Sequence, residues 1–255
     1  MKSSTVWLSL AFALACSSAQ AADNVRVARD FTDMVAPTDQ QAYEAGTKHF
    51  NQCLHQHGFK YNWTAWTHET GDTYSYSYVS DPMPWATFDA MDTAVKACLG
   101  VIHSDVNPHL KSEISAFMQA MPELSHQPKD MGPPPPLIEV RYFTLKPGHQ
   151  AVETFMAAVK KIAAAAAKSN WPHYFQFARM IDAGDGAPDF ILVIPDKNWA
   201  DVGTEPDPDV WKMVENVYGK SDAAAIRQSI NDAVAKQSSH VDSYNAELSY
   251  IASGK

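Results

Sequence analysis

Hydrophobic and polar positions in the second half of the chain change regularly between strand and helix periodicity. In chain order the pattern predicts a strand, a long helix, two strands, two helical stretches and a final strand, at residues 137–145, 149–169, 173–181, 189–194, 208–218, 222–237 and 240–251. The long helix has core spacing at Val152, Phe155, Val159 and Ile162. This half therefore predicts an α+β unit with helices packed on its sheet.

The first half shows a similar order. Strands are predicted at residues 24–31, 59–68, 73–79 and 122–130, and helices at 39–57, at a stretch closed by Leu99-Gly100, and at 108–121. Gly71 lies 14 residues before Trp85, and Gly184 lies 15 residues before Trp199, so the hairpin turns and tryptophans keep nearly the same spacing. The order β-α-β-β-α-β is ferredoxin-like, and we predict that the chain contains two such repeats.

A run of prolines at residues 133–136 divides the chain. Such a run cannot extend a helix or a central strand and favours a short, stiff linker. The predicted organisation is a signal peptide at 1–21, a first repeat at 22–131, a linker at 132–136 and a second repeat at 137–255.

The first 21 residues have the order of a secretory signal peptide. Lys2 precedes a mostly apolar segment, and Ala19-Gln20-Ala21 follows it as a small-x-small cleavage site. Cleavage after Ala21 predicts a periplasmic or secreted protein. Lipidation at Cys16 is the less favoured alternative, because Ala13 stands where lipoprotein signals carry leucine.

Removal of this segment leaves Cys53 and Cys98. An even pair of cysteines in an oxidising compartment favours a disulfide, and two free buried thiols are the alternative. Each cysteine lies near the end of a predicted helix on the same face of the sheet. That placement supports the bridge.

Composition excludes several classes of partner. The chain of 255 residues has 20 basic and 29 acidic residues, a net charge of −9, and no stretch dense in lysine or arginine. It therefore offers nothing to neutralise a row of phosphates, and no nucleic-acid partner is predicted. No second long apolar run follows the N-terminus, so no stable membrane span is predicted. We expect a monomer or a homodimer.

The segment Glu139-Val-Arg-Tyr-Phe-Thr-Leu-Lys-Pro-Gly148, with the helix after it, resembles the opening of NIPSNAP-type domains in the dimeric α/β-barrel superfamily. The resemblance implies two ferredoxin-like sheets that face each other across a barrel, with the tandem chain similar to a fused dimer. The superfamily includes antibiotic-biosynthesis monooxygenase-like, haem-degrading and chlorite dismutase-like proteins, and members without assigned activity. Fold analogy does not choose among these functions.

Strand alternation selects candidate residues for the barrel lining. In residues 137–145 we expect Val140 and Tyr142 on the helix side, which leaves Glu139 and Arg141 toward the opposite sheet. The two charges would form either a polar ligand clamp or a structural ion pair.

The strand at residues 73–79 places Tyr74, Tyr76 and Tyr78 on one face. With Tyr61 and Trp63 they could form an aromatic wall for a flat or apolar ligand, or ordinary intersheet packing. Both interpretations stay open at this point.

No metal site and no cofactor are predicted. His49, His55 and His57 share a helix, but their spacings do not place a ligand pair on one face. The haem-degrading branch uses an Asn, a Trp and a His distributed across its fold, and this arrangement cannot be carried over onto particular residues. A haem ligand at His173 or His68 stays an alternative.

Motifs of hydrolases, nucleotide-binding loops and zinc proteases are absent from the sequence. We therefore predict an exported protein of unassigned biochemical activity, with binding of a small hydrophobic or aromatic ligand between its two sheets as its candidate role. Whether it is an enzyme stays open, and a structural or interaction protein with a completely packed barrel is a further option. The alternative is a cofactor-free or haem-dependent oxygenase similar to the monooxygenase-like branch.

Overall fold

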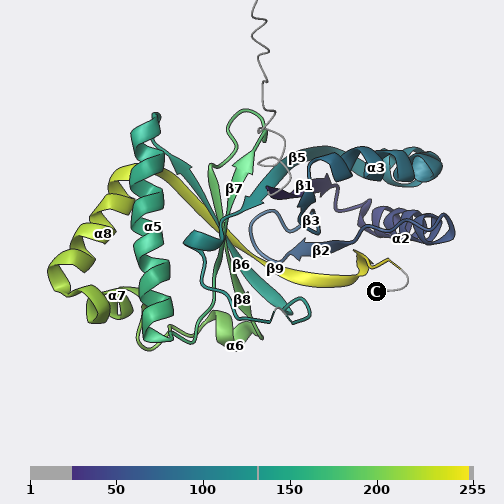
Figure 1. The fold of residues 1–255 in the computed structure, drawn as a ribbon. Coiled ribbons are helices and arrows are strands. Elements are labelled where there is room, and N and C mark those ends of the chain that lie inside the picture. Colours follow the sequence, from purple (N-terminus) through teal and green to yellow (C-terminus); the bar gives the residue numbers. More distant parts are fainter. Residues whose placement is uncertain (1–24, 131, 253–255) are drawn as a thin grey trace, which may run out of the picture.

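Eight strands close into a barrel in the computed structural model, and helices cover it on two sides (Figure 1). The structure describes residues 25–130 and 132–252, so the predicted signal peptide, its cleavage site and Cys16 lie outside the described residues. The strands are β1 (Arg26–Val35), β2 (Trp63–His68), β3 (Ser75–Ser80), β4 (Met83–Pro84), β5 (Leu110–Ala120), β6 (Leu137–Leu145), β7 (Gln176–Ile181), β8 (Phe190–Asp196) and β9 (Val234–Tyr250).

The helices flank the barrel in two groups. They are α2 (Gln40–Gln56), α3 (Ala86–Val95), α4 (Leu99–Val101), α5 (His149–Ser169), α6 (Trp199–Val202), α7 (Val210–Tyr218) and α8 (Lys220–Ala233), with short helical turns η1 (Lys96–Cys98), η2 (Ile102–Val106), η3 (Asn107–His109) and η4 (Pro122–Leu124). Figure 1 shows α5, α7 and α8 on one side of the strands and α2 and α3 on the other. No helix in the described part is long and apolar enough to cross a bilayer.

The barrel strands follow the order β3-β2-β9-β6-β8-β7-β5-β1, and pairing of β1 with β3 closes the ring. The short β4 pairs with the start of β1. Within the first half the order is β5-β1-β3-β2, and within the second it is β9-β6-β8-β7. The β2–β9 and β5–β7 ladders join the halves. The predicted mixed α+β fold with a barrel is confirmed at this level.

The expected helix at residues 108–121 is wrong. Residues Leu110–Ala120 form β5, which pairs with β1 and β7, and residues 122–130 contain the turn η4 rather than a fourth strand. Lys, Glu, Ala, Met and Gln give this segment helical propensity. Pairing on both edges outweighs that preference, because strand formation depends mainly on the neighbours that a segment packs against.

The predicted faces of β6 are also reversed. Val140 packs inside the barrel with Trp66 and Ile191, and Tyr142 contacts the same cluster. Phe143 points outward instead, against Phe155 of α5 with ring centroids 5.3 Å apart. Alternation correctly separated the two faces, but each face carries large apolar side chains, and the charged Glu139 and Arg141 lie on the face that meets the helices, so the pattern did not show which face is covered by them.

A disulfide joins Cys53 of α2 to Cys98 of η1, with an S–S distance of 2.09 Å and a Cα–Cα distance of 5.9 Å. The predicted bridge is present. It connects two helical segments that, together with the outer face of the first-half strands, enclose a cavity.

Candidate functional site

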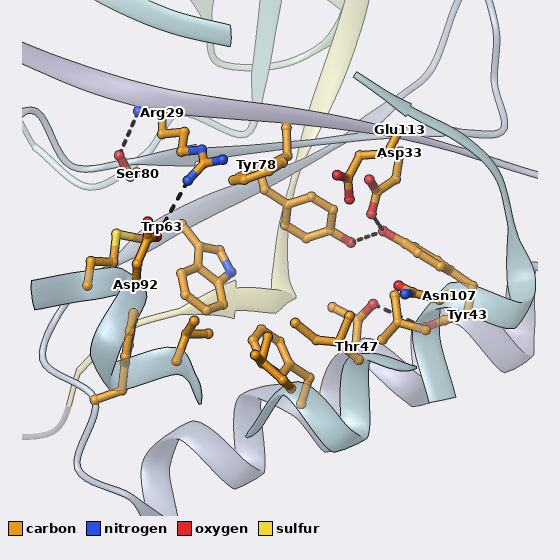
Figure 2. A pocket seen from close by; sticks show the side chains of 18 residues that line it. Arg29, Asp33, Tyr43, Thr47, Trp63, Tyr78, Ser80, Asp92, Asn107 and Glu113 are labelled. Carbon is orange, nitrogen blue, oxygen red and sulfur yellow. Dashed lines mark hydrogen bonds and ion pairs between the residues drawn. The ribbon is translucent and has the colours of Figure 1, made fainter. Parts of the chain in front are cut away.

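A cavity of about 400 Å³ lies between the outer face of the first-half strands and the helices α2 to η2 (Figure 2). Its walls are largely aromatic and aliphatic. Trp63 stacks on Tyr250 with centroids 4.9 Å apart and lies 6.1 Å from the Phe50 ring. Phe59, Phe31, Met91, Val95, Leu99, Ile102 and Val106 complete the apolar lining.

One end of the cavity carries a chain of hydrogen bonds from two elements. The Tyr43 hydroxyl, from α2, donates to Oδ2 of Asp33 on β1 at 2.6 Å. The hydroxyl oxygens of Tyr43 and Tyr78 lie 2.7 Å apart, and because Tyr43 donates to Asp33, Tyr78 donates to Tyr43. Figure 2 shows Glu113 of β5 beside Asp33 at this end. The other carboxylate oxygen of Asp33, Oδ1, is buried and accepts no hydrogen bond.

Burial raises the pKa of Asp33 to about 7. The hydrogen bond from Tyr43 works in the opposite direction, and the neighbouring Glu113 carboxyl adds to the increase in pKa. Burial also raises the pKa of Tyr43 and of Tyr78 well above the ordinary tyrosine value. The cavity therefore has two neutral phenols linked to one carboxyl group that changes its protonation near neutral pH.

Arg29 also lines the 400 Å³ cavity, away from the hydrogen-bond chain of Asp33, Tyr43 and Tyr78. Its guanidinium stands 4.5 Å from the Phe31 ring centroid and 5.6 Å from that of Phe117. Its Nη1 atom lies 3.6 Å from Oδ1 of Asp92, which is exposed to solvent. The cation is thus partly neutralised and held against aromatic faces.

The predicted aromatic residues are brought together, but outside the barrel. Trp63 and Tyr78 line the cavity. Tyr76 is buried under α2, with its ring 4.9 Å from that of Tyr43, and Tyr61 packs edge-on against Phe59. Tyr74 is 37% exposed. The aromatic wall therefore faces α2, and the expectation that it lies between the two sheets is wrong.

Glu139 and Arg141 form an ion pair, with Nη2 and Oε2 2.9 Å apart. Arg141 lines a second cavity of about 930 Å³, beside Phe143 and against α5, α7 and α8. The two charges consequently lie on the outer face of β6 rather than inside the barrel. Their distance is that of an ordinary partly exposed ion pair.

The second cavity is the counterpart of the first in the other half of the molecule. Its lining combines rings from strands and helices with acidic and basic side chains of the loop before α7 and of α8. Arg227 lies 5.2 Å from the Trp211 ring centroid. The first cavity differs from it by its buried carboxyl and phenol chain.

Neither set of described lining residues contains a histidine or a free cysteine, and the two phenols of the first cavity, Tyr43 and Tyr78, are neutral and hydrogen-bonded to Asp33 and to each other, so the lining does not fit a haem group. His68 lies inside the barrel, with its ring stacked 4.3 Å from that of His240. His173 packs 5.0 Å from the Trp171 ring.

Sequence reasoning missed Asp33, Tyr43 and Glu113. Asp33 and Glu113 face each other in the β1–β5 ladder, and the segment containing Glu113 was expected to be helical. Tyr43 belongs to a correctly expected helix. However, a single aromatic residue on the apolar face of a helix does not indicate that its hydroxyl takes part in a chain of hydrogen bonds.

Solved structures share the fold, whereas no family model and no curated protein matches the sequence. A candidate monooxygenase from Lactobacillus acidophilus NCFM is 8% identical, with a TM-score of 0.53 over 89% of this chain and 96% of that one. An anthrone oxidase-like protein is 11% identical, with a TM-score of 0.53 over 91% and 95%. A chlorite dismutase variant from Candidatus Nitrospira defluvii is 10% identical, with a TM-score of 0.53 over 87% and 92%. The TM-scores show that the chain resembles these proteins in its α/β-barrel fold, and identities this low support nothing beyond the fold.

Proposed function

We propose that the protein binds a small, neutral aromatic ligand in the 400 Å³ cavity between the first-half strands and α2. The observation that carries this proposal is the hydrogen-bond chain Tyr78–Tyr43–Asp33 at one end of a cavity otherwise lined by rings and aliphatic groups. Ligand sites typically combine an apolar lining with a few convergent polar groups and a group of shifted pKa. The volume also lies within the usual range for such sites, about 300–1,000 Å³.

The hydrogen-bond chain Tyr78–Tyr43–Asp33 determines which chemical group of a ligand can bind at this end of the cavity. Tyr78 donates to Tyr43, so its own oxygen, which lies beside the Thr47 hydroxyl, keeps the capacity to accept a hydrogen bond from a ligand hydroxyl. The flat ring of such a ligand would lie against Trp63. Asp33 and Glu113 disfavour an anionic ligand at this end of the cavity.

Titration with naphthol tests this proposal, with naphthalenesulfonate as the anionic comparison. We expect saturable binding of naphthol and much weaker binding of the sulfonate. Tyr78→Phe removes one hydrogen bond and should weaken naphthol binding about two- to tenfold. The matched control is Tyr74→Phe, which removes the hydroxyl of an exposed tyrosine in the turn just before β3 and should leave affinity unchanged. Equal effects of the two variants would refute the site.

The alternative is a cofactor-free oxygenase that uses the same cavity. Asp33, with a pKa of about 7, can accept a substrate proton relayed through Tyr78 and Tyr43. For anthrone the balanced reaction is anthrone plus O₂ giving anthraquinone plus water, with two substrate hydrogens and one oxygen atom leaving as water. The likeness to the monooxygenase and oxidase-like structures supports only the fold that this activity would use.

Oxygen uptake tests the alternative. We expect one O₂ consumed per anthraquinone formed, and a rate at least tenfold lower in Asp33→Asn. Naphthol binding without any enzyme-dependent O₂ uptake would leave the protein a binding protein and reject the oxygenase.

The proposal also covers the organisation and location of the chain. Equivalent strand orders in the two halves support two ferredoxin-like repeats at 22–131 and 137–255 joined by the 132–136 linker. The sequence of residues 139–148 supports a NIPSNAP-like origin. The N-terminal pattern supports export to the periplasm or the medium. The proposed oligomeric state is a monomer or a homodimer. Mass spectrometry of the mature protein should find Ala22 as its first residue, and an uncleaved Met1 would reject export by this signal.

A further inference from the structure

The barrel interior holds a buried group of two histidines and an aspartate. His68 of β2 stands opposite Asp242 of β9 in the ladder that joins the two halves. His240 lies two residues before Asp242, so both side chains point to the same face of β9. The three side chains have exposed fractions of 8%, 12% and 3% for His68, His240 and Asp242.

The ligand atoms of this group converge. Oδ1 of Asp242 lies 3.1 Å from Nε2 of His240 and 3.9 Å from Nε2 of His68. This buried oxygen accepts no hydrogen bond, because the bond from His240 goes to Oδ2 at 3.2 Å. An unsatisfied carboxylate oxygen inside a protein is costly, and here it points between two imidazole nitrogens.

We propose that His68, His240 and Asp242 bind a divalent transition-metal ion inside the barrel. Ligand atoms of all three residues lie within 4.8 Å of one another. In a tetrahedral zinc site with bonds of about 2.0–2.2 Å, the ligand atoms lie about 3.3–3.6 Å apart. The side chains therefore have to close by about 1 Å, and the two stacked imidazole rings have to tilt toward the ion. Two imidazoles and one carboxylate form a donor set used by zinc and by iron(II) in proteins.

The surroundings supply what such a site requires. Nε2 of His68 lies 3.0 Å from the hydroxyl of Ser77, which in turn lies 3.0 Å from that of Thr32, so a small turn of the ring exchanges the Ser77 hydroxyl for the ion. Asp30 places a second carboxyl group in the electrostatic field of Asp242, and a dication would offset both charges.

This site is independent of the proposed aromatic ligand site. His68 and Ser77 face the barrel interior, whereas Tyr76 and Tyr78, on either side of Ser77 in β3, face α2. The strands that form the barrel wall therefore separate the two sites. Either site can be present without the other.

Calorimetric titration of chelator-treated full-length mature protein with Zn²⁺ tests the proposal, together with the visible spectrum of the Co²⁺ form. We expect one ion per chain and, for Co²⁺, the absorption bands of a nitrogen- and oxygen-ligated site. His240→Gln and Asp242→Asn should each weaken binding at least tenfold. The matched control, His103→Gln, removes an exposed histidine and should retain wild-type affinity.

Two results would overturn the proposal: a wild-type protein that binds neither ion, or a His240→Gln variant that binds Zn²⁺ as tightly as wild type. Should the variants fail to fold, the wild-type protein still decides the question. The anomalous difference map of a crystal soaked in Zn²⁺ should place the ion among His68, His240 and Asp242, and an ion found only at surface residues would contradict the site.

Discussion

The hydroxyl of Tyr43 donates a hydrogen bond across 2.6 Å to Oδ2 of Asp33, and this contact joins α2 to β1 at one end of the cavity. The helix that covers the strands therefore also supplies the partner for their buried carboxyl group. Because Asp33 and Tyr43 are both buried, neither can exchange this partner for bulk water. The contact links the stability of the first half to the chemistry of its cavity.

The raised pKa of Asp33 predicts that stability falls as pH rises. Its folded-state pKa is about 7 and its ordinary value is 3.8, so the folded protein holds a proton that the unfolded chain has lost over this range. The contribution is fully present below about pH 4 and is lost as pH rises through about 7, with an upper limit of about 4 kcal/mol.

Asp33→Asn should flatten the dependence of the free energy of unfolding on pH, as measured by urea denaturation from about pH 4 to pH 8. Burial and the charge of Asp242 also raise the pKa of Asp30 to about 7. Part of the pH dependence of the unfolding free energy therefore remains in the Asp33→Asn variant. The exposed Asp185→Asn variant is the control. An unchanged slope in Asp33→Asn would contradict the assigned environment of Asp33.

The disulfide should make a large contribution to stability. Cys53 and Cys98 are separated by 45 residues, and the chain-entropy model gives about 4 kcal/mol for a loop of this length. The double variant Cys53→Ser/Cys98→Ser should unfold at a correspondingly lower urea concentration. Reductant should lower wild-type stability to that of the double variant and leave the variant itself unchanged. A wild-type protein insensitive to reductant under unfolding conditions would contradict the bridge.

Close packing of α2 on η2 predicts that Gly46 tolerates no side chain. A Cβ atom at Gly46 would lie 2.0 Å from the backbone oxygen of Asp105. Gly46→Ala should therefore destabilise the protein by about 1–3 kcal/mol or more, although alanine is the better helix former. Gly100→Ala is the matched control, because nothing lies within 4 Å of its added Cβ. Thermal unfolding of both variants checks this, and a Gly46→Ala variant as stable as Gly100→Ala would be inconsistent with the packing.

The hydrophobic periodicity correctly predicted those helices that have one face buried against the strands and the other face exposed to solvent. The helix expected at residues 39–57 is α2, Gln40–Gln56, and the one at 149–169 is α5. It failed for β5, where strand pairing outweighs helical propensity, and for the faces of β6, where both sides are buried. Local sequence cannot report contacts with segments that arrive from elsewhere in the chain.

The residues of the candidate sites illustrate the same limit. Trp63 and Tyr78 were detectable because aromatic side chains alternate along two neighbouring strands. Asp33 and Tyr43 meet only once α2 folds back over β1, and His68 meets His240 only when β2 pairs with β9. Spacing within one helix, on which a sequence search for metal ligands depends, carries no information about pairs of this kind.

The most direct test of the central claim is the location of a bound aromatic probe. A crystal soaked with bromonaphthol should show the anomalous signal of bromine in the cavity bounded by Trp63, Tyr78 and Phe59, with the probe hydroxyl within hydrogen-bond distance of the Tyr78 oxygen. Bromine found only in the cavity beside Trp211, inside the barrel or on the surface would contradict the assignment of the ligand site.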